Sequence, residues 1–123
     1  MKKILVIEDE LAYLKLLESQ LTKKGYEVIR AEDGKTGLDK AIKDHPDLIL
    51  LDIRMPGMDG LAMLDLLRKE ETGKKLKVII LTNLEPDEKI IAEVINDQPS
   101  YYFVKSDIKF NDLLDKIKSL IAG

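Results

Sequence analysis

The chain has 123 residues, of which 45% are apolar and 35% charged, with a formal net charge of −3. These values fit one folded domain with an ordinary core, and they exclude a disordered chain, a membrane-spanning chain and the basic surface of a nucleic-acid binder. No cysteine is present, which excludes disulfides, thiolate nucleophiles and thiolate metal sites. The opening MKKILVIEDE contains an apolar run too short for a signal peptide or a membrane span, so we expect a cytoplasmic protein.

Short apolar runs rich in β-branched or aromatic residues predict five strands. In chain order they are residues 4–7, 26–31, 48–52, 78–82 and 101–105. Three of the runs are apolar on consecutive residues, which indicates burial on both faces and is typical of a parallel sheet covered by helices.

Apolar residues at helical spacing follow each run and predict five helices. The stripes are Leu14, Leu17 and Leu21; Leu38, Ala41, Ile42 and His45; Leu61, Leu64 and Leu67; Ile90, Ile91, Val94 and Ile95; and Leu113, Leu114, Ile117, Leu120 and Ile121. Strands that alternate with helices predict a doubly wound α/β domain. Right-handed crossovers then place helices on both faces of the sheet.

Polar side chains stand where the predicted strands end, at the edge where doubly wound sheets bind ligands. They are Glu8, Asp9 and Glu10 after the first strand, Asp52 at the end of the third, Thr82 and Asn83 at the fourth, and Lys105 at the fifth. We expect these groups to meet on one rim.

Clustered carboxylates repel one another unless a cation lies among them. Because the available ligands are all oxygens, the site suits Mg²⁺, which keeps several waters and accepts a phosphoryl oxygen. Lys105 would add a second positive charge and Thr82 a hydroxyl donor, which together favour phosphoryl transfer. Asp52 ends the central strand and is the predicted nucleophile. The turn over residues 53–58 leaves room for the phosphoryl group and lets the Arg54 carbonyl face the metal.

Four fragments together resemble a known family: ILVIEDE, DLILLDIRMPGMDG, VIILT and YYFVK. In order and spacing they resemble the receiver domain of two-component response regulators, over essentially all of residues 1–123, and we expect no output domain. The resemblance implies a flavodoxin-like sheet of order 2-1-3-4-5.

The same resemblance assigns roles to individual residues. It implies that Asp52 is the phosphoacceptor, Asp9 a direct Mg²⁺ ligand and Glu8 a ligand acting through water. It further implies that Thr82 is the switch hydroxyl, Lys105 the phosphoryl-binding lysine and Tyr102 the switch aromatic. Packing in the core is the other interpretation of Tyr102, because Tyr101 and Phe103 flank it.

The implied function is signalling. A histidine kinase or phosphotransfer protein would phosphorylate Asp52, and the surface of helix four, strand five and helix five would change and contact a downstream protein. The resemblance implies a signalling domain and not an enzyme, since it would catalyse only its own aspartyl phosphorylation and dephosphorylation. It further implies a monomer or a weak phosphorylation-dependent dimer, with no direct contact to nucleic acid or membrane. The candidate contact residues are Lys89, Glu93, Tyr101, Lys109 and Asp112.

Two positions depart from the family pattern. Ser106 follows Lys105 where proline is usual, so we expect no cis bond there. Asn83 stands where small residues are common, and it narrows access to the site.

Three other functions fit parts of the pattern. A flavin carrier has the same architecture but needs a phosphate-binding loop after strand one, where this chain has Glu8, Asp9 and Glu10. An aspartate-nucleophile phosphatase needs a second acid two residues after the nucleophile, where this chain has Arg54. A docking module that is never phosphorylated would not need the complete set of acids, hydroxyl and lysine.

Overall fold

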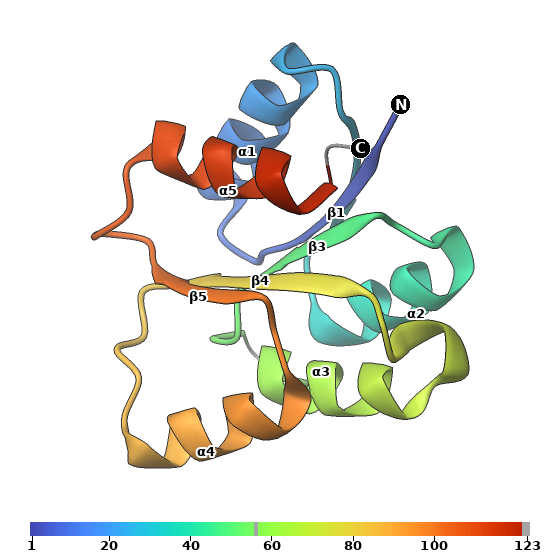
Figure 1. Cartoon of the computed structure of the whole chain (residues 1–123), viewed down its shortest axis with the longest axis vertical. Helices are drawn as coiled ribbons and strands as arrows, with labels where there is room; N and C mark the ends of the chain where they lie inside the picture. The colour runs from blue at the N-terminus through green and yellow to red at the C-terminus, as the bar shows by residue number, and fades with distance from the viewer. Residues whose placement is uncertain (56, 122–123) are drawn as a thin grey trace.

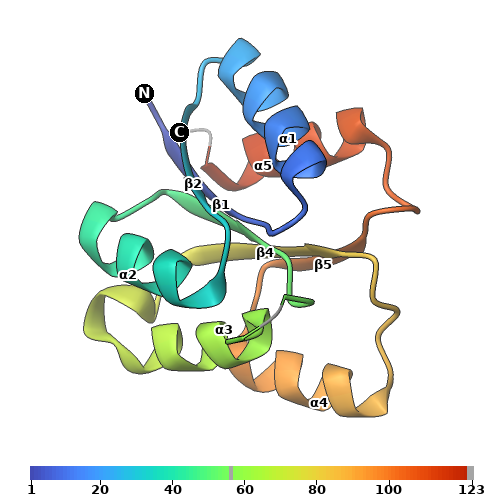
Figure 2. The ribbon, with the colours of Figure 1, turned by 180° about the vertical axis from the view of Figure 1, so that it is seen from behind.

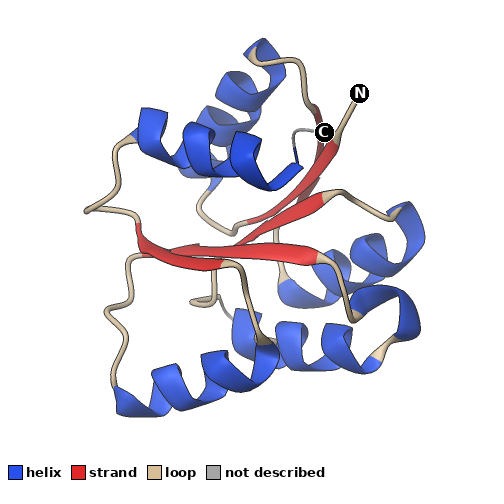
Figure 3. Cartoon of the chain, viewed as in Figure 1, coloured by secondary structure: helices blue, strands red, loops and turns tan. Residues whose placement is uncertain are grey.

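The computed structural model describes residues 1–55 and 57–121, so Pro56 of the predicted turn lies outside the described residues. Five strands form the sheet: β1 (Lys3–Ile7), β2 (Glu27–Ala31), β3 (Leu48–Leu51), β4 (Lys77–Thr82) and β5 (Tyr101–Val104). All four pairings are parallel, and the strand order is β2-β1-β3-β4-β5. The doubly wound fold and the 2-1-3-4-5 order are therefore confirmed (Figure 3).

Five α-helices cover the sheet, and one short 3₁₀-helix, η1, follows α3. Their bounds are α1 (Leu11–Lys23), α2 (Gly34–Asp44), α3 (Gly60–Lys69), η1 (Glu71–Gly73), α4 (Glu88–Asp97) and α5 (Phe110–Ile121). Helices α1 and α5 lie on one face of the sheet, and α2, α3 and α4 lie on the other (Figures 1 and 2). No helix within the described residues is long and apolar enough to cross a membrane.

The consecutive apolar residues of the strands build two cores, one on each face. In β1, Leu5 and Ile7 belong to the core under α2 and α3, whereas Ile4 and Val6 belong to the core under α1 and α5. Successive side chains of a strand point to opposite faces, so a run that is apolar throughout supplies both cores. The expected burial on both faces is confirmed.

Aspartates begin three of the helices. Asp33, Asp59 and Asp87 are the N-cap residues of α2, α3 and α4, and the carboxylate of each accepts a hydrogen bond from an amide three residues further along. These bonds satisfy amides that have no partner inside the helix.

The structure corrects several details of the predicted elements. Strand β3 ends at Leu51, so Asp52 lies one residue beyond the strand, and the other strands differ from the prediction by one residue at an end. His45 does not pack with the α2 stripe: it is exposed and ends the helix in a left-handed conformation with φ of 49°. The residue before a proline is disfavoured in the helical region, and Pro46 follows it.

The stripe predicted for α4 is only partly buried. Ile90 and Val94 pack against the core, but Ile91 is 46% and Ile95 67% exposed. The four residues span more of the helix circumference than its contact with the sheet covers, so two of them face outward.

Candidate functional site

The ends of four strands bring the predicted site residues to one edge of the sheet. Sheet-like hydrogen bonds continue one residue past the strands: the Asp52 amide donates to the Ile7 carbonyl at 3.0 Å, and the Lys105 amide donates to the Thr82 carbonyl at 2.7 Å. These bonds fix the backbone of Asp52 and Lys105 although neither residue belongs to a strand.

Gly60, the first residue of α3, packs directly against the loop that carries Asp52. A Cβ atom at this position would lie 2.5 Å from the Asp52 carbonyl oxygen and 2.5 Å from the Cα of Ile53. Helix α3 therefore begins in direct contact with the backbone that follows Asp52, and only glycine allows that approach.

Three carboxylates converge at this edge. Oxygen atoms of Glu8, Asp9 and Asp52 all lie within 4.8 Å of one another. Glu8 is 2% and Asp52 6% exposed, whereas Asp9 is exposed. Such a cluster repels itself unless positive charge balances it.

Lys105 supplies positive charge inside the cluster. Its Nζ lies 2.7 Å from Glu8 Oε2 and 3.1 Å from Asp52 Oδ2, and its side chain is only 7% exposed. The ammonium thus bridges two of the three carboxylates. Sequence reasoning brought Lys105 to this edge but did not predict the ion pair with Glu8.

The pKa values of Glu8 and Lys105 are both raised, for different reasons. Burial, and to a smaller extent the nearby charge of Asp52, raise the pKa of Glu8 to about 7, against the hydrogen bonds from Lys105 and the Glu10 amide and the charge of Lys105, which lower it. Burial lowers the pKa of Lys105, but hydrogen bonds and charges from Glu8 and Asp52 outweigh it, and the pKa rises overall. Both groups therefore hold their protons more tightly, Glu8 mainly because it is buried and Lys105 because two carboxylates lie beside it.

Each carboxylate oxygen of Asp52 accepts one hydrogen bond. The Arg54 amide donates to Oδ1 at 2.9 Å, and the Lys105 ammonium donates to Oδ2 at 3.1 Å. Each oxygen keeps a second lone-pair direction for another ligand. The carboxylate is thus oriented and still able to bind or react.

Thr82 and Tyr102 connect this edge to the loop before α4. Thr82 is fully buried, and its Oγ1 accepts a hydrogen bond from the Leu84 amide at 3.3 Å. The Tyr102 hydroxyl donates to the Leu84 carbonyl at 2.6 Å. Tyr102 also packs against the core under α2 and α3, which agrees with the core-packing interpretation, and its role as the switch aromatic stays a prediction.

The predicted rim residues line one pocket of about 200 Å³. It is lined by Glu8, Asp9, Glu10, Asp52, Arg54, Thr82, Asn83 and Lys105. Tyr102 does not line it. Glu10 is also the N-cap residue of α1, without a side-chain capping bond.

The oxygen atoms of the pocket fit Mg²⁺. Hard divalent cations take carboxylate, carbonyl and water oxygens, and Mg²⁺ needs only one or two carboxylates besides water and phosphate oxygens. Glu8, Asp9 and Asp52 would hold it, because the oxygens that lie close together are theirs.

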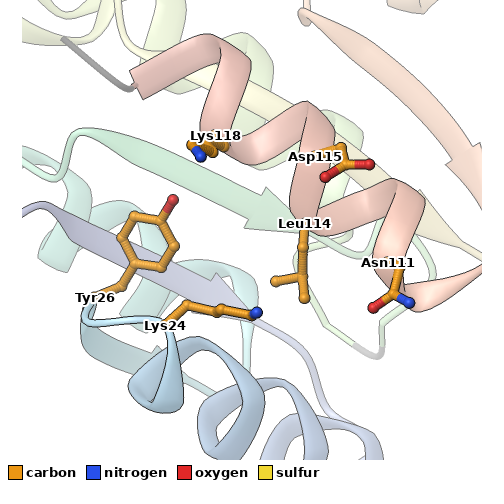
Figure 4. A pocket seen from close by; sticks show the side chains of 6 residues that line it. All are labelled: Lys24, Tyr26, Asn111, Leu114, Asp115 and Lys118. Atoms are coloured by element: carbon orange, nitrogen blue, oxygen red, sulfur yellow. The ribbon is translucent and has the colours of Figure 1, made fainter.

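A larger groove lies elsewhere and lacks this chemistry. It has a volume of about 650 Å³ between α5 and the end of α1, and it is lined by Lys24, Tyr26, Asn111, Leu114, Asp115 and Lys118 (Figure 4). It has a single carboxylate, at an exposed position. The smaller pocket is therefore the candidate site.

Sequence reasoning missed two side chains that contact functional parts of the fold. The ring of Tyr13, in the first turn of α1, lies 4.4 Å from the Lys105 ammonium. The Arg68 guanidinium donates to four backbone carbonyls, those of Gly73, Leu76, Asp97 and Gln98. Neither set of contacts has a signal in the local pattern, because Tyr13 is distant in sequence from Lys105, and Arg68 from Asp97 and Gln98.

The chain matches a known family over most of its length. Residues 4–118 match the family described as the response regulator receiver domain. Among curated proteins, the chain is 45% identical over 83 residues to the response regulator PleD of Caulobacter vibrioides, covering 68% of this chain and 18% of PleD. It is 38% identical over 81 residues to sporulation initiation phosphotransferase F of Bacillus subtilis, covering 66% of this chain and 64% of that protein. The chain thus spans less than two thirds of these relatives.

Solved structures with the same fold cover nearly the whole chain. The response regulator TrrA of Thermotoga maritima, solved with Mg²⁺ and BeF, is 36% identical, with a TM-score of 0.86 over 98% of this chain and 100% of that one. The chemotaxis protein CheY4 of Vibrio cholerae is 27% identical, with a TM-score of 0.88 over 98% of this chain and 99% of that one.

Proposed function

Because the chain belongs to the response regulator receiver domain family, we propose that Asp52 accepts a phosphoryl group from a histidine kinase or a phosphotransfer protein. The observation that carries the proposal is the contact of one buried ammonium, Lys105, with two members of a three-carboxylate cluster. This arrangement supplies a nucleophile and a fixed positive charge at the same point.

In the proposed reaction a carboxylate oxygen of Asp52 attacks phosphorus. A phosphorus–oxygen bond forms, the bond from phosphorus to the donor breaks, and the donor leaves with that electron pair. Mg²⁺ would supply positive charge that neutralises the charge developing on the phosphoryl oxygens. The residues that would hold it are Asp9 directly, Glu8 through water, Asp52, and Arg54 by its carbonyl. Lys105 would exchange its contact with Asp52 Oδ2 for a phosphoryl oxygen.

The proposed switch begins at Thr82. Its hydroxyl turns to donate to a phosphoryl oxygen and gives up the bond from the Leu84 amide. Because the Tyr102 hydroxyl is bonded to the Leu84 carbonyl, the loop and the aromatic ring rearrange together. Phosphorylation therefore favours one of two arrangements of the same residues.

The proposed output is a protein contact on the α4, β5 and α5 surface. Lys89, Glu93, Lys109 and Asp112 are exposed there, and Tyr101 is half-buried. An apolar groove of about 200 Å³ on this surface is lined by Pro86, Ile90, Ile91, Val94, Ile95 and Tyr102. Tyr102 joins this groove to the loop before α4, which supports its role in the switch.

The proposal is tested with Mg²⁺ and acetyl phosphate, a small phosphodonor, by weighing the intact protein. We expect a gain of one phosphoryl group that disappears without Mg²⁺ and in Asp52→Asn. The matched control is Asp39→Asn, which removes an exposed carboxylate on α2 and should leave the gain unchanged. A wild-type mass unaltered by saturating donor and Mg²⁺ would refute the proposal.

A further inference from the structure

Lys105 has a third neighbour, which the proposed reaction does not use. Its Nζ lies 4.4 Å from the centroid of the Tyr13 ring. A cation within about 6 Å of a ring face is attracted by the ring quadrupole, and the attraction grows as water is removed. Because the Lys105 side chain is only 7% exposed, solvent screens this contact little.

Tyr13 contacts Lys105 without entering the pocket. It lies in the first turn of α1, half-buried against the core under α1 and α5. It is absent from the residues that line the 200 Å³ pocket. The contact that connects its ring to the candidate site is therefore the one with Lys105.

The nature of the contact suits a group that has to change partners. Before phosphorylation Lys105 is held by Glu8 and Asp52. In the proposed reaction both carboxylates gain other partners, and a four-carbon side chain released by them would regain rotamer freedom. A neutral ring holds the ammonium by its face and accepts no strong hydrogen bond, so the N–H groups stay free for phosphoryl oxygens.

We infer that Tyr13 is a positioning residue whose ring holds the Lys105 ammonium toward the phosphoryl group on Asp52. The inference rests on the proposed function and adds to it a residue of α1 outside the acidic pocket. The ring face provides the contact, and among the described residues the Tyr13 hydroxyl makes no hydrogen bond. Phenylalanine at this position should therefore preserve the contact with Lys105, whereas leucine should abolish it.

The experiment compares Tyr13→Phe and Tyr13→Leu with the wild type by NMR titration of fluoroberyllate, a phosphoryl mimic, at saturating Mg²⁺. We expect Tyr13→Leu to bind it about fivefold more weakly, as loss of a cation–π contact predicts, and Tyr13→Phe to bind like the wild type. Tyr26→Leu is the matched control, because Tyr26 is also a half-buried tyrosine but lines the separate groove of Figure 4. Its affinity should not change.

A second readout needs no ligand. The ε-methylene protons of Lys105 should be shifted upfield by the Tyr13 ring in the wild type and in Tyr13→Phe, and this shift should be lost in Tyr13→Leu. Equal fluoroberyllate affinities in wild type and Tyr13→Leu would overturn the inference alone, as would an equal loss in Tyr13→Phe and Tyr13→Leu. A wild type that binds no fluoroberyllate would overturn the proposed function and this inference with it.

Discussion

The hydroxyl of Tyr102 donates a hydrogen bond to the carbonyl oxygen of Leu84 at 2.6 Å. The amide of Leu84 donates a second hydrogen bond, to Thr82 Oγ1 at 3.3 Å. One backbone residue of the loop between β4 and α4 therefore joins a side chain that lines the pocket to a side chain that lines the apolar groove on α4. This connection is a hydrogen-bonded route from the candidate site to the proposed output surface.

Removal of the Tyr102 hydroxyl should loosen the loop. We expect Tyr102→Phe to lower the free energy of unfolding by about 1 kcal/mol, the net value of an ordinary hydrogen bond, and to speed amide hydrogen exchange over residues 83–87. Tyr101→Phe is the matched control, because no hydrogen bond of the Tyr101 hydroxyl is found among the described residues. Exchange rates that are the same in Tyr102→Phe and the wild type would refute the coupling.

The sequence was sufficient to predict the sheet and the edge where the site lies. Apolar runs ending on Asp52, Thr82 and Lys105 predicted convergence because parallel strands end at the same edge. Contacts within the site were harder to predict. Both the pairing of Lys105 with Glu8 and the stacking of Tyr13 on Lys105 depend on side-chain directions set by tertiary packing, which a one-dimensional pattern does not contain.

The errors in the prediction have the same origin. Helical spacing places Ile91 and Ile95 with Ile90 and Val94, but how much of a helix the sheet covers depends on the docking of α4. His45 fits the spacing of α2, yet the following proline ends the helix there. The bonds of Arg68 to two later segments likewise depend on the packing of α3.

The proposed phosphoacceptor, Asp52, should lower the stability of the fold, because it lies in a cluster of carboxylates. With Glu8, Asp9 and Asp52 close together, we expect Asp52→Asn to raise the free energy of unfolding without Mg²⁺ by about 1 kcal/mol, through relief of repulsion. Urea unfolding measures this change. Lower stability of the variant would show that the bonds from Lys105 and the Arg54 amide outweigh the repulsion.

Mg²⁺ should reverse the order of these stabilities. Binding to the folded state alone stabilises it by about 1.4 kcal/mol at tenfold the dissociation constant. We expect this gain in the wild type and little of it in Asp52→Asn, in the same urea experiment. An equal effect of Mg²⁺ on both proteins would place the ion away from Asp52.

Arg68 should be important for the attachment of α4. Its guanidinium bonds the carbonyl oxygens of Gly73, Leu76, Asp97 and Gln98 at 2.7 to 3.1 Å. Replacement by methionine keeps an apolar chain but leaves these carbonyls without the donor, so we expect a loss of about 2 kcal/mol in unfolding free energy. Arg68→Lys should recover only part of it, because an ammonium lacks the planar fork of donors.

The next residue provides the control for Arg68. Lys69 forms an exposed ion pair with Asp65 at 3.1 Å, and exposed pairs contribute little. Lys69→Met should therefore change the unfolding free energy by less than about 0.5 kcal/mol. Equal effects at the two positions, or full recovery by Arg68→Lys, would contradict the role assigned to the guanidinium.

The hydrogen bonds of Asp33 at the start of α2 should make the free energy of unfolding depend on pH, in a direction that follows from the pKa of Asp33. The Asp33 carboxylate accepts hydrogen bonds from the Thr36 amide at 2.8 Å and the Thr36 hydroxyl at 3.1 Å, and these bonds lower the pKa of Asp33. A lowered pKa in the folded state stabilises the fold above the ordinary pKa of aspartate, and this contribution is lost as pH falls through the lowered value. Asp33→Asn should therefore be less stable than the wild type at neutral pH.

Acidification should remove that difference, because the protonated wild-type side chain resembles asparagine. Urea unfolding of both proteins from neutral pH downward measures the change. Asp39→Asn, on the exposed side of the same helix, controls for general charge effects. A difference that grows toward low pH would show that the sign is wrong.

The most direct test identifies which residue carries the phosphoryl group. An aspartyl phosphate is an acyl phosphate, and borohydride reduces it to an alcohol, which converts the residue to homoserine. After treatment with Mg²⁺ and acetyl phosphate, reduction and peptide sequencing by mass spectrometry should find homoserine at position 52 and at no other position, and only when Mg²⁺ was present. Homoserine at position 9 or elsewhere, or none at all, would contradict the assignment of Asp52 as the residue that is phosphorylated.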